Sequence, residues 1–332
     1  MRRTASFIYA TRGKGRPQIV LVGNGLEYAS GQPSWEKLID RLRVPDCLML
    51  SKEMEEKIPF PLLYVLLSSH SPAFSQLTKA DIQEEEGRLA DAMRELKHVS
   101  NPGLDILPTL GADHIFTTNY SYCIENAFMP DKDFLSPNVR SRYRFNLSPL
   151  KENGKIGQEK NYRLHTGYLA KNKDGNPVGI WHIHGECTVS RGVVLGHDRY
   201  GRLISRIESI CKSQSYPEDE TDYVHKQFTS WPELFLYGDI YIIGLGYWLC
   251  DFDLWWLLRR KQRERFADGK VYFYDNGQDE RSKIRDMLMS VHGVMINPGI
   301  NKESDYNRFY RNVLADIASR IKDNKTRSLA EK

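Results

Sequence analysis

Residues 20–35 read VLVGNGLEYASGQPSW. The stretch begins as a short apolar run, as a buried strand does, and then breaks into closely spaced glycines. Glycine loses much conformational freedom on folding, so this density indicates that the backbone must approach another group closely. A strand that ends at Gly23, Asn24 and Gly25, with a helix predicted from Ser34, is typical of phosphate binding, although a tight turn would use the same residues. The spacing is not the G-x-G-x-x-G fingerprint, because Tyr28 stands where the third glycine belongs.

The rest of the chain alternates apolar runs with amphipathic stretches. The apolar runs are short and hydrophobic on both faces, as in a parallel sheet covered by helices. We therefore predict an α/β fold, a Rossmann-like, doubly wound, mostly parallel sheet with helical insertions. The expected strands are 18–23, 113–118, 179–185, 239–246, 270–275 and 293–299, and the expected helices are 34–43, 81–98, 120–128, 200–213, 252–266, 279–291 and 304–322.

The chain of 332 residues is interpreted as a single domain over 1–332. Two regions interrupt the alternation of strand and helix. Residues 45–105 have a mostly helical pattern, and we expect a helical insertion there. Residues 129–178 are rich in polar residues and glycine without a clear period, so we expect an irregular insertion, either over the ligand site or as a long surface loop.

Composition limits the classes of function. The net charge of +4 is too small to indicate nucleic acid as the main partner. No apolar run approaches the ~20 residues of a membrane span, and the first residues lack a signal-peptide block, so we expect a cytoplasmic protein. The five cysteines include no CxxC pair, which argues against both a disulfide framework and a cysteine zinc site.

The segment Thr117-Thr118-Asn119-Tyr120 follows the second predicted strand. Ligands of open α/β sheets collect at the carboxyl ends of strands. The Asn119 side chain carries a donor and an acceptor, so it could hold a ribose hydroxyl or orient a water. An asparagine here could also cap the helix predicted at 120–128.

The segment Trp181-His182-Ile183-His184-Gly185 contains two histidines two residues apart. In a strand their side chains would share one face. No third ligand stands at metal spacing, so we expect no metal. His184, beside Gly185 at the carboxyl end, is the candidate general base, because an ordinary histidine pKa of ~6.5 lets it accept a proton near neutrality. A hydrogen-bonded structural histidine is the other interpretation, and it fits His182 better than His184.

A second glycine pair, Gly244 and Gly246, follows the strand 239–246 and is succeeded by Tyr247 and Trp248. This pattern again indicates a close backbone approach beside a helix. We expect Asp251 or Asp253 to cap the helix 252–266.

Taken in order along the chain, these motifs resemble the sirtuin-like family, and more narrowly the bacterial sirtuin-like domains that hydrolyse NAD in antiphage defence. The resemblance runs from about residue 18 to 299. It implies that Asn119 and His184 form the catalytic pair. It also implies that the dinucleotide is bound by the glycine motifs and the strand ends, at Gly23, Asn24, Gly25, Thr118, Gly244, Gly246, Tyr247, Asp275 and Asn276.

The sequence departs from this family in two places. Sirtuin deacetylases carry a four-cysteine zinc module, which this sequence lacks, so the resemblance implies NAD cleavage rather than protein deacetylation. Leu26-Glu27 replaces the alanine-serine pair that follows the second glycine in many members. The expected function is an NAD glycohydrolase that releases nicotinamide and ADP-ribose and depletes NAD. The alternative is a subunit of a defence complex that senses NAD or ADP-ribose, or binds a partner, without catalysis.

Such an activity needs control, so we expect a homo-oligomer or a separately encoded sensor or activating protein. The helix predicted at 252–266 carries Trp255 and Trp256 followed by a basic run. These residue types are enriched in interfaces, although a helix buried on two sides within the domain would also use them.

Overall fold

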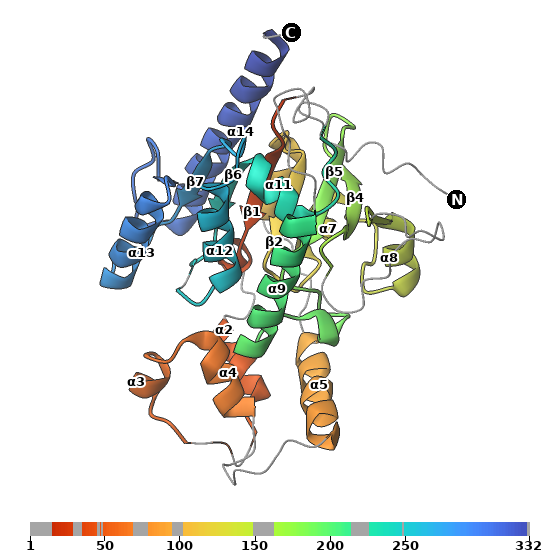
Figure 1. The fold of residues 1–332 in the computed structure, drawn as a ribbon, viewed down its shortest axis with the longest axis vertical. Helices are drawn as coiled ribbons and strands as arrows, with labels where there is room; N and C mark the ends of the chain where they lie inside the picture. Colours follow the sequence, from red (N-terminus) through yellow and green to blue (C-terminus); the bar gives the residue numbers. More distant parts are fainter. Residues whose placement is uncertain are drawn as a thin grey trace.

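The computed structural model describes residues 15–28, 35–44, 47, 49–68, 79–94, 102–148, 163–213, 226–247 and 249–330 (Figure 1). Its strands are β1 (Gln18–Val22), β2 (His114–Thr117), β3 (Arg144–Asn146), β4 (Thr166–Lys171), β5 (Pro177–His182), β6 (Asp239–Ile243), β7 (Val271–Tyr274) and β8 (Met295–Ile296). Its helices are α1 (Asn24–Tyr28), α2 (Trp35–Leu42), α3 (Lys52–Glu55), α4 (Phe60–Ser68), α5 (Lys79–Arg94), α6 (Pro102–Asp105), α7 (Cys123–Phe128), α8 (Pro137–Tyr143), α9 (His197–Ser213), α11 (Trp231–Tyr237), α12 (Phe252–Lys261), α13 (Glu280–Val291) and α14 (Tyr306–Ala330).

The described strands form one eight-stranded mixed sheet in the order β3-β4-β5-β2-β1-β6-β7-β8. The six strands from β5 to β8 in this order run parallel, whereas β4 is antiparallel to β5 and β3 to β4. The expected Rossmann-type α/β fold is confirmed. The connections place β2 on one side of β1 and β6 on the other, so the strand order reverses at β1. Ligands of doubly wound sheets bind at such a switch point.

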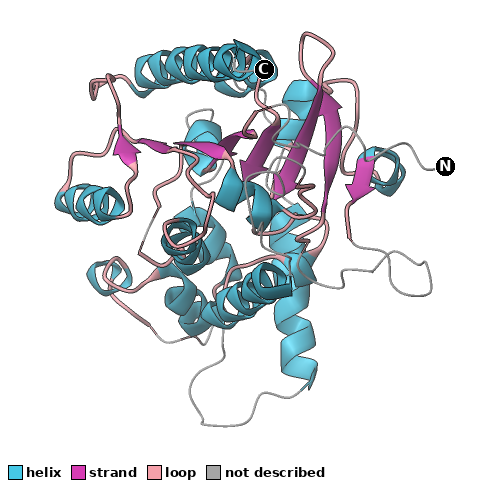
Figure 2. Cartoon of the chain, turned by 45° about the horizontal axis from the view of Figure 1, so that its top comes forward, coloured by secondary structure: helices cyan, strands magenta, loops and turns pink. Residues whose placement is uncertain are grey.

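The central strand β1 shows why the sheet forms. All five of its residues, QIVLV, are buried, and its side chains alternate between two hydrophobic clusters. Val20 and Val22 pack with α14 on one face, whereas Ile19 and Leu21 pack with α9, α11 and α12 on the other. Figure 2 shows the sheet between helices on both sides. Coverage of both faces explains the continuously apolar strands.

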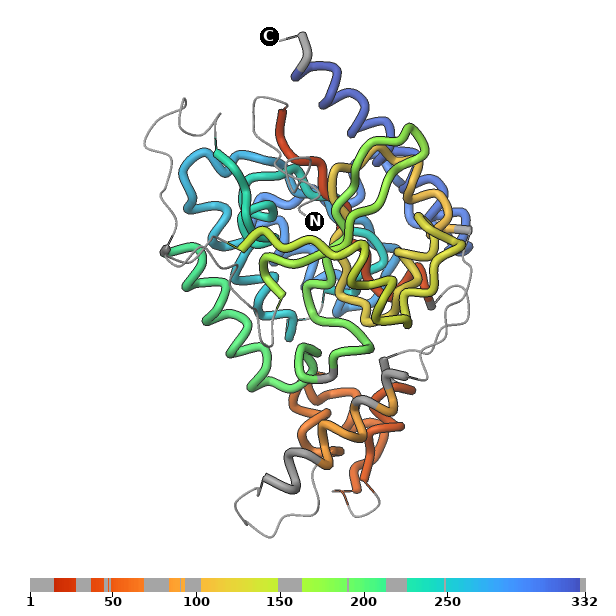
Figure 3. The backbone as a smooth tube through the Cα atoms, turned by 90° about the vertical axis from the view of Figure 1, so that its right-hand side faces the viewer, coloured from red at the N-terminus to blue at the C-terminus, as the bar shows by residue number. Residues whose placement is uncertain are grey.

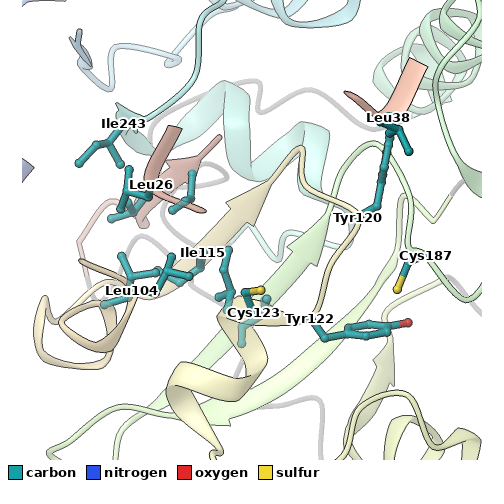
Figure 4. Packing of buried hydrophobic residues seen from close by; sticks show 14 of the residues in the cluster. Leu26, Leu38, Leu104, Ile115, Tyr120, Tyr122, Cys123, Cys187 and Ile243 are labelled. Carbon is teal, nitrogen blue, oxygen red and sulfur yellow. The ribbon is translucent and has the colours of Figure 1, made fainter. Parts of the chain in front are cut away.

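The helices α2 to α5 leave from the carboxyl end of β1 and lie at one end of the molecule, away from the C-terminal end of α14 (Figure 3). In the described residues, the helical pattern expected over 45–105 is present as α3, α4, α5 and α6. The apolar face of α2 joins the first hydrophobic cluster through Leu38, which lies near Tyr120 in Figure 4. This helical segment is thereby attached to the segment that follows β2.

The irregular segment expected over 129–178 is a wrong prediction for its described part. That part contains α8, β3 and β4, and starts β5. The strand β4 has the sequence TGYLAK, in which glycine and lysine weaken any strand pattern. Its pairing with β5 supplies the stability that the local sequence lacks, through the register Tyr168↔Ile180.

Three predicted strand bounds are also wrong, and one of them is that of the strand expected at 239–246, which ends at Ile243. The strand expected to run to 185 ends at His182, because its neighbour β2 ends at Thr117 and no further ladder can form. The strand expected at 293–299 is reduced to β8, since Asn297 has φ 41° and turns the chain. The organisation of 1–332 as a single domain remains a prediction.

Candidate active site

The carboxyl ends of five adjacent strands carry the residues singled out in the sequence. In sheet order, His184 follows β5, Asn119 follows β2, Gly23 follows β1, Gly244 follows β6 and Asp275 follows β7. The fold therefore brings motifs from the whole length of the chain to one edge of the sheet.

Gly23 and Gly25 are in contact with the loop after β6. The Gly23 amide donates to the Ile243 carbonyl at 2.9 Å, and the Gly25 amide donates to the Gly244 carbonyl at 2.6 Å. A Cβ on Gly23 would lie 2.5 Å from that Gly244 oxygen. Gly244 itself has φ +65°, which favours glycine. In this structure the glycines allow the end of β1 to lie close to the end of β6.

The chain after Gly23 also differs from the expected loop, because the short helix α1 begins at Asn24. Its Leu26 lies beside Ile243 (Figure 4), and both belong to the first hydrophobic cluster. The glycine, proline and serine of the same motif at 31–34 lie outside the described residues, as does Trp248.

Asn119 is buried and is held by hydrogen bonds on three sides. Its amide Nδ2 donates to Glu27 Oε1 at 2.7 Å, its backbone N–H donates to Thr117 Oγ1 at 3.0 Å, and its carbonyl oxygen is 2.9 Å from His182 Nδ1. The side-chain oxygen Oδ1 is buried without a hydrogen-bond partner. The capping interpretation is wrong, because α7 begins only at Cys123 and Tyr122 occupies its N-cap position.

His182 has both ring nitrogens occupied. Nδ1 must donate to the Asn119 carbonyl, which can only accept, and Nε2 lies 2.8 Å from Glu125 Oε1. Burial lowers the pKa of His182, but Glu125, together with Glu186 and the Asn119 carbonyl, outweighs burial and raises that pKa to about 9. His182 is thus a buried imidazolium that links β5 to α7, which matches the structural interpretation.

His184 lies beyond the strand, in a turn that ends at Gly185 with φ +102°. Its position therefore does not follow from the alternation of side chains along a strand. Its Nε2 is 2.9 Å from Asp253 Oδ2 on α12, and its ring meets Tyr200 edge-on with centroids 5.5 Å apart. Burial lowers the pKa of His184, but the Asp253 carboxylate raises it above the ordinary value overall. The histidine and its partner form an oriented, buried pair.

The expectation that Asp251 or Asp253 caps α12 holds only for the position of Asp251. Asp251 occupies the N-cap position but makes no side-chain capping bond, and its Oδ1 is 3.5 Å from the Tyr200 hydroxyl. Asp253 is inside the helix and fully buried, with Oδ2 on His184 and Oδ1 without a hydrogen-bond partner. The helix after β6 thus contributes a carboxylate to the site.

The remaining dinucleotide-binding candidates surround the ends of β1, β2, β6 and β7. Thr118 is buried beside Asn119, and Asn24 is half-buried in α1. Gly246 is exposed, and its carbonyl accepts from Arg285 at 2.8 Å. Tyr247 is fully buried at φ 46°, and its hydroxyl has no hydrogen-bond partner.

Asp275 and Asn276 organise the loop after β7. Asp275 Oδ2 accepts from Arg285 at 2.6 Å and from the Gly277 amide at 2.8 Å. Both polar atoms of the Asn276 side chain bind the backbone of Glu303. In this structure these two side chains therefore hold the loop itself in place.

Three buried carboxylates near these motifs were assigned no role at the site from the sequence. Glu27, Asp253 and Glu186 are each at most 3% exposed. Burial would raise the pKa of Glu186, but Arg163, His182 and the hydroxyls of Tyr168 and Tyr122 hold it below its usual value. The signal that could have found two of them is an acidic residue inside an apolar stretch beside a strand end, as in GLEY and FDLWWLL.

Comparison with known proteins finds a family match over part of the chain. Residues 113–235 match a SIR2-like domain. The match runs from the start of β2 into α11 and includes Asn119 and His184, so this segment is similar to that domain. No curated protein matches the chain.

A solved structure described as a Sir2 homolog–NAD complex covers 98% of this chain and 96% of its own, at 12% identity and a TM-score of 0.32. So loose a superposition does not place a ligand in this chain. In the described residues, no helix is long and apolar enough to cross a membrane. The described residues also contain no group of three or more His, Cys, Asp or Glu side chains that could hold a metal ion.

Proposed function

We propose that this protein hydrolyses NAD at the nicotinamide–ribose bond, producing nicotinamide and ADP-ribose. The observation that carries the proposal is that Oδ1 of Asn119 is buried without a hydrogen-bond partner at the end of β2. β2 pairs with β5, and the turn that contains His184 follows β5. A buried carbonyl oxygen without a donor costs free energy unless a ligand or water supplies one. The SIR2-like match over 113–235 supports NAD as that ligand.

The reaction needs few groups from the protein. The C1′–N bond breaks, and its electron pair stays with the pyridinium nitrogen, so nicotinamide leaves neutral. A water oxygen then bonds to C1′ of the oxocarbenium-like ribose and loses a proton. Asn119 would accept a hydrogen bond from the ribose or this water, and His184 would accept the proton.

In this proposal the proton goes to Nδ1 of His184. Asp253 occupies Nε2, so in the neutral histidine the remaining proton sits on Nε2 and points to the carboxylate. The lone pair is then on Nδ1. Because Asp253 raises the pKa of His184, the base form is the minor one at low pH, and activity should increase as the pH rises.

That raised pKa also favours a second candidate function. A protonated His184 cannot accept a proton, but it can bind an anion, so the chain could sense NAD or ADP-ribose without cleaving it. In either role we expect an antiphage-defence context, with the site controlled either by assembly into a homo-oligomer or by a separately encoded sensor or activating protein. The partly buried Trp255 and Trp256 pack against the second hydrophobic cluster of this chain, so any such interface remains a prediction.

The test compares NAD consumption by Asn119→Ala, His184→Ala and the unaltered protein. Loss of a general base costs about 10²–10⁴ in rate, so His184→Ala should release nicotinamide that much more slowly. Asn119→Ala, which loses the hydrogen bond to the ribose or water, should also release little, and both variants should remain folded by circular dichroism. His114→Gln is the matched control, since His114 is equally buried, at 2%, but lies at the opposite end of β2. Full activity in both site variants would refute the catalytic pair, and NAD binding without consumption by the unaltered protein would favour sensing.

A further inference from the structure

Glu27 is the residue that stands where the sequence departs from the sirtuin-like pattern. It lies in α1, is 3% exposed, and its two carboxylate oxygens contact the segment after β2. Oε1 accepts from Asn119 Nδ2 and Oε2 accepts from Ser121 Oγ, both at 2.7 Å. A carboxylate from one strand end therefore holds two side chains at the neighbouring strand end.

This contact determines which way the Asn119 amide faces. The two ends of an asparagine side chain have almost the same shape, and their orientation follows from the hydrogen-bond partners. A carboxylate accepts hydrogen bonds and does not donate them, so the NH₂ group must face Glu27. The carbonyl Oδ1 must then face the other way, where it is buried and unpartnered.

The state of ionisation leaves this orientation intact. Burial raises the pKa of the Glu27 carboxyl, against the hydrogen bonds from Ser121 and Asn119 and the charge of His182. If Glu27 does take up a proton on Oε2, the Ser121 hydroxyl can accept it, and Oε1 remains an acceptor for Asn119. The backbone of Asn119 is separately fixed by Thr117 and His182, so rotation of the amide is the freedom that Glu27 removes.

We propose that Glu27 is a positioning residue that locks the Asn119 amide with its oxygen toward the ligand, so that the site accepts a hydrogen-bond donor there. The role of this donor rests on the proposed function, in which it is a ribose hydroxyl or the attacking water. A serine or alanine at position 27 could not lock the amide, because the serine hydroxyl both donates and accepts and alanine does neither. The glutamate at position 27, where the sequence departs from the sirtuin-like pattern, thus fixes the orientation of the Asn119 amide in this proposal.

The experiment uses Glu27→Gln, which keeps the shape but can face Asn119 with either a donor or an acceptor. Side-chain amide resonances are recorded on the ¹⁵N-labelled protein, and that of Asn119 is assigned by its absence in Asn119→Ala. In the unaltered protein we expect one Asn119 amide proton shifted downfield by the carboxylate. In Glu27→Gln we expect that shift to be lost and nicotinamide release to fall about 10- to 100-fold, the effect of mispairing one buried polar group.

Binding of ADP-ribose, measured by calorimetry, distinguishes the two donors. If the donor is a ribose hydroxyl, Glu27→Gln should weaken ADP-ribose binding by a similar factor. If it is the attacking water, the rate should fall while ADP-ribose binding stays the same. Glu233→Gln is the matched control, because Glu233 is a 2% exposed carboxylate that accepts from Thr229 and Ser230 at the start of α11.

The outcomes separate this inference from the proposed function. An unaltered protein that never consumes NAD refutes the hydrolase, but the Asn119 resonance still tests Glu27. An unshifted Asn119 amide in the unaltered protein overturns the lock, and this measurement needs no folded variant at position 27. An unchanged resonance and rate in a folded Glu27→Gln overturns it as well.

Discussion

The pairing of His184 with Asp253 leads to a prediction about Asp253→Asn, a change that removes the charge and keeps the shape. Asp253 is fully buried, and its Oδ2 lies 2.9 Å from His184 Nε2. Burial lowers the pKa of His184 and the carboxylate raises it, so without the carboxylate the pKa must fall. The rising limb of the pH–rate profile should therefore move to lower pH.

The size of the effect on the maximal rate follows from the same contact. At high pH His184 is neutral in both proteins, so a difference there reports how Asp253 orients the ring and stabilises the imidazolium that forms as the water attacks. Hydrogen bonds to charged groups contribute about 1.5–3 kcal/mol. Since about 1.36 kcal/mol corresponds to a factor of ten, the plateau rate should fall by about 10- to 150-fold.

The assay is initial nicotinamide release as a function of pH, from well below to well above the ordinary histidine pKa of about 6.5. The expected result is a lower plateau reached at lower pH, in a variant that stays folded. If the plateau rate falls but the rising limb does not move, Asp253 orients the His184 ring and does not set its pKa. An unchanged profile, or a limb that moves to higher pH, would refute the reasoning.

Three further predictions concern the scaffold. Gly23→Ala should destabilise the protein and shift the loop at Gly244, because the new Cβ would lie 2.5 Å from backbone atoms of that loop. Gly87→Ala is the contrasting variant in α5, where a Cβ would have open space, and it should add about 0.5–1 kcal/mol to the free energy of unfolding. The pKa of buried His114 is lowered to about 4, so the free energy of unfolding should fall by about 3 kcal/mol as the pH decreases from about 6.5. The pKa of His182 is raised to about 9, so the free energy of unfolding should also fall by about 3 kcal/mol as the pH increases from about 6.5, and chemical denaturation measures both. Because the sequence lacks CxxC pairs, elemental analysis should find less than stoichiometric zinc, and a chelator should not change NAD consumption; one zinc per chain would contradict this.

The parallel part of the sheet could be predicted from sequence because its strands are locally unambiguous. The buried runs of β1, β6 and β7 are almost continuously apolar or aromatic, and each lies within a few residues of its expected bounds. The antiparallel strand β4 was missed because its stability comes from pairing with β5 rather than from its own residues. Local pattern predicts elements that are stabilised by burial on both faces and misses those that depend on a neighbour.

The residues of the candidate site also divide into those that local sequence predicts and those that depend on distant parts of the chain. Glycines and histidines at strand ends are visible in the sequence as residue types with special conformations or chemistry. The carboxylates that orient Asn119 and His184 are 92 and 69 residues away from them along the chain. The sequence can mark Glu27 and Asp253 as acids inside apolar stretches, but only the fold reveals which side chains they bind.

The central place of β1 has a consequence for the synthesis of the protein. β1 is made before the segments with which it pairs, which lie 95 and 221 residues further along the chain. Pairings this distant form late in folding. When the ribosome has already delivered Asn119 and His184, neither the strand that completes the sheet beside β1 nor Asp253 exists. For an enzyme that consumes NAD, as we propose, a nascent chain that lacks β6 and α12 would be harmless to its own cell, and activity would begin only once both have been made and have joined the fold.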